Sequence, residues 1–303
     1  GVGNLIGHSE TPEGTTEEPV QLVAEDGGGS HGVLYTRGRE TTAIIIMHPR
    51  VEMSRHYLIP ALLKAGHAVF GQNGRWTNND ASTSHEVLLA DVAAGVRFLK
   101  ETRGYQQVVC VGNSGGGSLY TFYQAQAVTD PPGRLTDTAA GDPFDLNQIS
   151  MPPLDGAIIL AAHGGQGKYL MASIDPSVTD ENDPLSRDPA LDMYNPDNGF
   201  EEPPGWSKYS DEFVSRYAKA QEARVARIDA IARRHIADQR FHQTLMSAPD
   251  FSSRPFREQQ TIIQRAVVGR YMTINRTEAN LCFCDPSIDP STRGYGSLWS
   301  RRP

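Results

Sequence analysis

A serine lies among glycines between a strand-like and a helix-like segment, in the run QVVCVGNSGGG at 107–117. Gly112, Ser114 and Gly116 match the pattern G-x-S-x-G. Small neighbours let the chain reverse sharply, so Ser114 can adopt a strained backbone conformation and present its hydroxyl at the carboxyl edge of a sheet. A serine in that position can act as a nucleophile toward an acyl carbon.

The helix predicted after this turn directs its N-terminal amides at the same place. We therefore expect the Gly115 N–H to bind a developing oxyanion, and Asn113 to lie among the substrate-binding residues. The short pattern also occurs by chance, with the serine merely capping a helix, but the strand-turn-helix context favours the nucleophile. Nucleotide binding is disfavoured, because Ser114 interrupts G-x-G-x-x-G and no P-loop sequence is present.

Alternating strand-like and helix-like segments surround this motif. Strands are predicted at 20–24, 32–35, 42–47, 67–70, 107–111 and 154–161, and helices at 56–65, 84–103 and 115–127. The run 42–47 is apolar on both faces, which is typical of a central strand in a parallel sheet. Right-handed crossovers then predict a doubly wound, mostly parallel α/β sheet with helices on both faces.

The composition changes near Gly165. Residues 175–209 are acidic and proline-rich and are predicted to form loops, whereas 210–245 and 258–272 have helical spacing. Five arginines crowd the polar face of the longer helix; we interpret them as a solvated face, with an anionic-substrate site as the minor alternative: Arg224, Arg227, Arg233, Arg234 and Arg240. The predicted organisation is a core at 1–165, followed by an acidic loop and an inserted helical cap at 166–303.

The stretch from Thr42 to Ala161 resembles the α/β-hydrolase superfamily of serine hydrolases and esterases, over roughly the first 165 residues. The resemblance depends on the motif at 112–116, a nucleophile elbow, and on the loop His48-Pro49-Arg50. In that superfamily the loop after the third strand supplies the second amide of the oxyanion hole. Proline has no N–H, so the resemblance implies Arg50 or a neighbour as this donor, with His48 close to the substrate.

The superfamily's mechanism implies that Ser114 is activated by a histidine, which a carboxylate orients. The acid usually follows the sixth or seventh strand and the histidine the eighth, but no such pair is recognisable between 245 and 303. Either the last core strands are missing from this chain, or the triad is built unusually. His163 ends the sixth predicted strand; we expect it to line the pocket, and it is the first candidate for an unconventional base.

Other titratable residues are given structural roles. His85 is predicted to begin a helix, Asp80 to cap a loop near the site mouth, and Asp175 and Asp180 to form turns. The remaining histidines are interpreted as structural or solvated: His8, His31, His56, His67, His235 and His242.

The composition is that of a globular chain of 303 residues, 38% hydrophobic, with a net charge of −8. This balance argues against disorder and against nucleic acid as the partner, and no run approaches the ~20 apolar residues of a membrane span. Cys110, Cys282 and Cys284 form neither a disulfide framework nor a zinc pattern. With no signal peptide visible, we expect a cytoplasmic protein without metal or cofactor, its oligomeric state left open.

The sequence thus predicts a serine hydrolase that cleaves a carboxylic ester or related acyl bond of a small molecule through an acyl-Ser114 intermediate. The large cap suggests a medium-sized, partly apolar substrate. Amide, lactone or carbon–carbon bond hydrolysis by the same nucleophile stays open, as does a non-catalytic binding protein or inactive fragment with this fold. Haloalkane and epoxide chemistry is disfavoured, because those relatives have Asp in place of Ser114.

Overall fold

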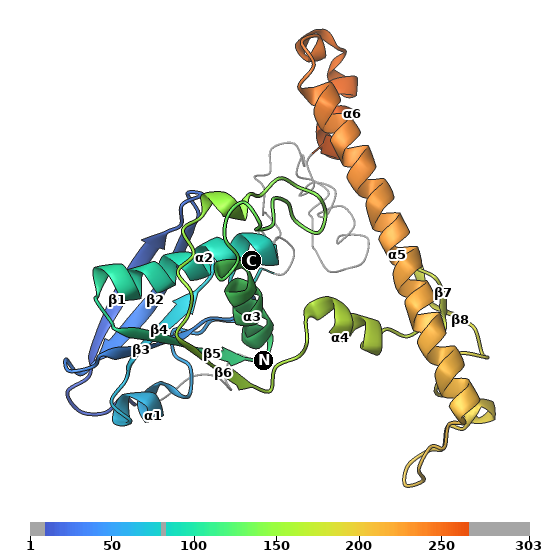
Figure 1. Ribbon diagram of the computed structural model, residues 1–303. Coiled ribbons are helices and arrows are strands. Elements are labelled where there is room, and N and C mark those ends of the chain that lie inside the picture. The colour runs from blue at the N-terminus through green and yellow to red at the C-terminus, as the bar shows by residue number, and fades with distance from the viewer. Residues whose placement is uncertain (1–9, 80–82, 267–303) are drawn as a thin grey trace, which may run out of the picture. The chain divides into compact units, whose positions relative to one another are not determined.

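The computed structural model describes residues 10–79 and 83–266. They fall into two compact units, the first ending at Ser173 and the second beginning at Ile174. In Figure 1 the first unit runs from blue to green and the second from yellow to orange. Each unit is described by itself below.

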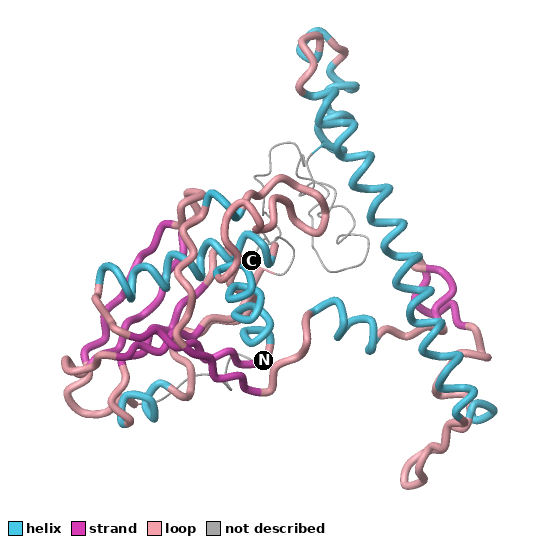
Figure 2. Tube along the Cα trace, in the orientation of Figure 1, coloured by secondary structure: helices cyan, strands magenta, loops and turns pink. Residues whose placement is uncertain are grey.

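The first unit is built on a six-stranded sheet, whose strands run side by side in Figure 2. The order is β1-β2-β4-β3-β5-β6, with β1 at Thr16–Val23, β2 at Gly29–Thr36, β3 at Thr42–Ile46, β4 at Ala68–Asn73, β5 at Gln107–Asn113 and β6 at Gly156–Leu160. The four strands from β3 to β6 are parallel, while β1 and β2 form an antiparallel hairpin that joins the sheet through β4. The predicted α/β class with a mostly parallel sheet is confirmed.

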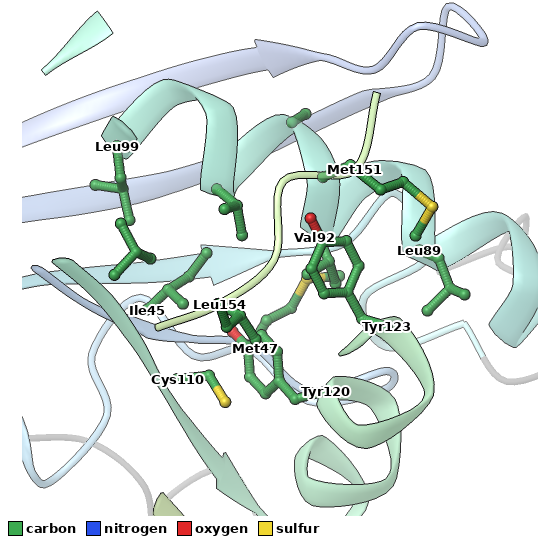
Figure 3. Packing of buried hydrophobic residues seen from close by; sticks show 14 of the residues in the cluster. Ile45, Met47, Leu89, Val92, Leu99, Cys110, Tyr120, Tyr123, Met151 and Leu154 are labelled. Carbon is green, nitrogen blue, oxygen red and sulfur yellow. The ribbon is translucent and has the colours of Figure 1, made fainter. Parts of the chain in front are cut away.

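Helices cover both faces of this sheet, as the two-sided apolarity of β3 predicts. On one face Ile45 packs in a cluster with residues of α2 (His85–Arg97) and α3 (Gly115–Ala127), several of which Figure 3 shows. On the other face Ile44 and Ile46 pack with α1 (Ile59–Lys64). Burial of such side chains from water is the main force that holds helices against a sheet.

Two predicted helix ends are confirmed at glycines. Gly66 follows α1 with φ +89°, and Gly104 has φ +71° after a five-residue π-helical turn that continues α2. An L-residue with a side chain rarely adopts this left-handed conformation, so glycine ends each helix at little cost. The chain is thereby returned to the sheet at β4 and β5.

The segment predicted to be irregular, 128–153, has one short 3₁₀ turn at Leu146–Gln148. Its apolar side chains nevertheless belong to the core, because Leu146, Ile149 and Met151 are buried in the cluster around α3. The Tyr123 hydroxyl on α3 donates to the carbonyl oxygen of Pro152 at 2.7 Å. The segment therefore forms the outer cover of α3.

The last element of the first unit, α4 (Gln166–Ser173), had not been predicted. In the second unit, α5 (Asp211–Met246) begins where Ser210 accepts a hydrogen bond from the Phe213 amide at 3.1 Å, and α6 (Phe256–Ala266) packs beside it. The rest of the predicted helix at 258–272 lies outside the described residues. No helix among the described ranges is long and apolar enough to cross a membrane.

The acidic segment predicted as loop contains a small antiparallel hairpin, β7 (Val178–Asp180) with β8 (Asp183–Arg187). The Glu181 carboxylate at its turn accepts from Arg224 at 2.8 Å and from Arg227 at 2.6 Å. The Arg224 hydrogen bond is the main cause of a lowered pKa of Glu181. These two arginines of α5 bind the hairpin. The Arg224 side chain is only 14% exposed, so the interpretation as a solvated face is wrong for Arg224, whereas Arg227 is both exposed and ion-paired.

Candidate active site

Ser114 occupies the sharp turn between β5 and α3. Its backbone has φ 52° and ψ −121°, and the residue is exposed, so its hydroxyl reaches solvent. A non-glycine residue at positive φ costs of order 1–3 kcal/mol and persists only where its surroundings impose it. The predicted strand-turn-helix geometry around the serine is present.

Close backbone approaches explain the glycines on either side of the turn. A Cβ on Gly112 would lie 2.5 Å from the Gly117 Cα, and one on Gly116 would lie 2.6 Å from the Met47 carbonyl oxygen. Real Cβ atoms do not approach backbone this closely. The start of α3 therefore sits directly on the carboxyl ends of β3 and β5 because these positions carry no side chain.

The first turn of α3 begins directly after Ser114. The N–H groups of an N-terminal helical turn have no partner within their helix, and the helix dipole makes this end positive. Gly115, the first residue of α3, offers its N–H beside the Ser114 hydroxyl. Asn113 is the last residue of β5, half-buried and paired with Leu160 of β6.

The loop after β3 approaches the same place. His48 is buried, with 8% of its surface exposed, and its Nδ1 accepts hydrogen bonds from the amides of Arg50 at 3.0 Å and Val51 at 3.1 Å. The Arg50 amide is thus directed at this imidazole, so its predicted role as an oxyanion donor would require that hydrogen bond to break. The His48 Nε2 lies 2.9 Å from where a Cβ on Gly115 would be.

A buried asparagine fixes the continuation of this loop, and sequence reasoning missed it. Asn73, at the end of β4, accepts from the Met53 amide at 2.7 Å and donates to the Glu52 carboxylate at 3.2 Å. The Asn78 amide also donates to the Arg50 carbonyl oxygen at 2.8 Å. The available signal was a polar residue at the carboxyl end of an apolar strand, where parallel sheets place their ligands.

A cavity of about 510 Å³ lies beside α3, one helical turn beyond the elbow. Its lining residues are His85, Ser118, Thr121, Phe122, His163, Gly164 and Gly165. The Ser118 hydroxyl is held by the Gly115 carbonyl oxygen at 3.0 Å, which ties the cavity floor to the elbow. The cavity combines glycine backbone and one aromatic ring with a few polar groups, as small-molecule sites commonly do.

The two histidines of this cavity come from different elements. His85 is the first residue of α2, where burial is the main cause of a lowered pKa; Glu86 raises it and His163 lowers it further. The His163 Nδ1 accepts from the Gly165 amide at 3.3 Å, and its ring lies 5.5 Å from that of Tyr169. His163 thus lines a cavity, and His85, predicted only to begin a helix, lines it too.

Several other residues considered from the sequence are not among those that line this cavity. Asp175 and Asp180 accept amide hydrogen bonds from residues two positions ahead, as turn formers do. His242, in the second unit, faces the Asp238 carbonyl oxygen at 2.7 Å. His8, Asp80, Cys282 and Cys284 lie outside the described residues, and within the described ranges no three His, Cys, Asp or Glu gather as a metal site would require.

Comparisons with known proteins give no family model and no curated protein that matches. Solved structures do match. An esterase of Pyrococcus furiosus aligns at 20% identity and a TM-score of 0.33, over 39% of this chain and 52% of its own. Brefeldin A esterase, a bacterial homologue of human hormone-sensitive lipase, aligns at 16% identity and a TM-score of 0.32, over 38% of this chain and 37% of its own. Prolyl oligopeptidase B from Galerina marginata aligns at 14% identity and a TM-score of 0.32, over 41% of this chain and 20% of its own. This chain therefore spans about half the length of the first of these enzymes.

Proposed function

We propose that this chain is a serine hydrolase of the α/β-hydrolase type, which cleaves a carboxylic ester or a related acyl bond through Ser114. One observation carries the proposal: Ser114 is held at φ 52°, exposed, at the N-terminus of α3. Strain at an exposed serine has no evident benefit for folding, and backbone strain of this kind is concentrated at functional sites.

In this mechanism the Ser114 Oγ bonds to the acyl carbon and the carbonyl electron pair moves onto oxygen. The Gly115 N–H and the positive end of α3 stabilise that oxyanion, a contribution of about 2.7–4 kcal/mol per donor in serine hydrolases. The serine proton passes to a base and then to the leaving oxygen as the alcohol departs. Water then cleaves the acyl-serine through the same oxyanion and releases the acid.

The cavity beside α3 is proposed to hold the acyl part of the substrate. Its volume of about 510 Å³ falls within the range of small-molecule sites, and the Phe122 ring provides an apolar wall. His163 and His85 supply its polar groups. The helical second unit is proposed as the cap that limits the access of water during the reaction.

A fluorophosphonate probe tests the nucleophile directly, because it reacts covalently with an activated serine. We expect one adduct, on Ser114 by peptide mass spectrometry, and none in Ser114→Ala. The matched control is Ser207→Ala, a serine of the second unit, which should label like the wild type. A folded wild-type chain without an adduct, or an adduct that persists in Ser114→Ala, would contradict the proposal and favour a non-catalytic binding protein.

A panel of activated substrates then separates the bond types. Hydrolysis of p-nitrophenyl esters with release of the acid, at rates well above those for matched anilides and lactones, is the expected result. A preference for the anilide or the lactone would keep Ser114 as nucleophile and change the assigned bond.

A further inference from the structure

We propose that the second oxyanion donor of this site is the imidazole Nε2–H of His48, and not a backbone amide of its loop. The inference deepens the proposed function and rests on it. It is carried by three observations: what the Nδ1 atom accepts, where the Nε2 atom lies, and how the loop is fixed.

The first observation determines where the imidazole proton is. The Nδ1 atom of His48 accepts from the Arg50 amide at 3.0 Å and from the Val51 amide at 3.1 Å. A ring nitrogen that accepts hydrogen bonds carries no hydrogen, and in the neutral ring the proton must then be on the other nitrogen. His48 therefore has an N–H donor at Nε2.

The second observation places that donor at the elbow. The His48 Nε2 is the nearest atom to a Cβ built on Gly115, at 2.9 Å, followed by its own Cε1 at 3.3 Å and the Pro49 Cγ at 3.4 Å. The ring edge thus lies against the residue whose N–H is the first oxyanion donor. A donor at Nε2 is thereby placed at the same end of α3 as the Gly115 amide.

The backbone of the same loop is directed elsewhere. Pro49 has no N–H, and the next two amides, of Arg50 and Val51, both point at the Nδ1 atom. These backbone amides donate to the imidazole and not to the substrate, and the imidazole Nε2–H takes their place as the oxyanion donor. This exchange accounts for a proline at a position where a backbone donor would be needed.

The third observation is that the ring is held in place. Two backbone amides donate hydrogen bonds to Nδ1. The loop that carries them is fixed in turn, because the Asn78 amide donates to the Arg50 carbonyl oxygen at 2.8 Å and the Asn73 side chain accepts from the Met53 amide at 2.7 Å. A donor that is fixed before the reaction needs no reorganisation when charge develops, which is the property that makes such donors effective.

The test separates the two functions of the imidazole. In His48→Asn the amide oxygen can replace Nδ1 as acceptor for the loop, but no donor reaches the position of Nε2. We expect kcat for p-nitrophenyl acetate to fall about 10²- to 10³-fold, the usual effect of losing one oxyanion donor, with KM little changed. His48→Gln, whose amide N–H extends toward the Nε2 position, should recover part of the lost rate.

A second measurement responds to the oxyanion itself. Sulfur accepts hydrogen bonds more weakly than oxygen, so the wild type should hydrolyse an ester much faster than its thionoester. This ratio should shrink in His48→Asn, whereas a purely structural loss would slow both substrates alike. His235→Asn, the same substitution at an exposed residue of α5, is the control and should keep the wild-type rate and ratio.

The tautomer is read independently of activity, by ¹⁵N NMR of the histidine-labelled full chain. A protonated Nδ1 in His48 would overturn the inference, as would a His48→Asn variant with the wild-type kcat and ester-to-thionoester ratio. Failure of the proposed function looks different: the wild type neither labels with fluorophosphonate nor turns over ester. That result would contradict the proposed function and, with it, the inference about His48.

Discussion

The Ser114 amide donates a hydrogen bond to the Leu160 carbonyl oxygen at 2.9 Å. It extends the pairing of β5 with β6 one residue past Asn113, which is itself paired with Leu160. On its other side, Ser114 accepts from the Gly117 amide at 3.1 Å, within the first turn of α3. The strained serine is thus fixed from a neighbouring strand and from its own helix, so its conformation depends on both.

Gly116→Ala tests this dependence. The new Cβ would lie 2.6 Å from the Met47 carbonyl oxygen, a backbone atom that cannot move without shifting the end of β3. We expect the free energy of unfolding in urea to fall by about 1–3 kcal/mol, as for other overpacked sites, and fluorophosphonate labelling of Ser114 to be lost. Gly29→Ala, where a Cβ meets nothing within 4 Å, is the control. Equal stability and labelling of both variants would contradict this account.

The parts of the fold predicted from sequence are those that local chemistry determines. The sharp turn at Ser114 follows from residues within a few positions of it, and Gly66 and Gly104 end their helices through their own backbone freedom. The central position of β3 follows from its unbroken apolar run. Each of these features needs no knowledge of a distant partner.

The parts that were missed depend on partners far along the chain. Arg224 lies 43 residues from Glu181, so helical periodicity alone could only assign it to a polar face. The bond between the Arg50 amide and the His48 ring depends on loop geometry, and the resemblance to other hydrolases pointed the other way. The short hairpin of β7 and β8 is acidic and contains Pro184, without the alternation that reveals a strand.

Loss of one partner of a buried ion pair should destabilise the first unit. Asp91 on α2 has no exposed side-chain surface and accepts from the Arg75 side chain at 2.6 and 2.9 Å, and from its amide at 2.9 Å. Asp91→Ala would leave the Arg75 guanidinium with the Asp26 carboxylate, at 2.6 Å, as its remaining ion-pair partner. We therefore expect the free energy of unfolding to fall by about 3 kcal/mol, the lower end of the range for a broken buried pair.

A double substitution checks the electrostatic origin of this loss. Asp91→Leu combined with Arg75→Met removes both charges of this pair and leaves only Asp26, whose side chain is 19% exposed to water. The double variant should therefore lose less stability than Asp91→Ala alone. Arg233→Ala, which breaks an exposed pair with Asp229, should have no measurable effect in the same urea titrations. If Asp91→Ala lowered the free energy of unfolding no more than Arg233→Ala does, the buried pair would not contribute to stability.

The pH dependence of stability should reveal His56. This residue is fully buried, and burial lowers the pKa of its imidazole to about 4. In the unfolded chain the pKa returns to about 6.5, so between these values the unfolded state binds more protons. Its contribution to stability is therefore present above pH 6.5 and is lost as the pH falls toward 4, by at most about 3 kcal/mol.

The measurement compares His56→Gln with the wild type in urea at pH 7 and pH 4.5. The difference in unfolding free energy between the two should be smaller at pH 4.5, because only the wild type loses this contribution. His235→Gln, at an exposed position, should keep a constant difference from the wild type. A His56→Gln difference that does not change with pH would exclude a buried neutral imidazole.

The cavity beside α3 should set the length of the acyl chain that the enzyme accepts. Thr121 lines this cavity and is exposed on the helix surface, where a larger side chain can be accommodated without disturbing the core. In Thr121→Phe the ring would fill part of the roughly 510 Å³. We expect KM for p-nitrophenyl octanoate to rise roughly tenfold, the cost of about 1.4 kcal/mol of lost binding, while kcat/KM for p-nitrophenyl acetate stays near that of the wild type. Val128→Phe, at an exposed position just beyond α3 and not among the residues that line the cavity, is the control. Loss of activity on both esters would instead mean that the substitution disturbs the elbow, and an unchanged octanoate KM would place the acyl chain elsewhere.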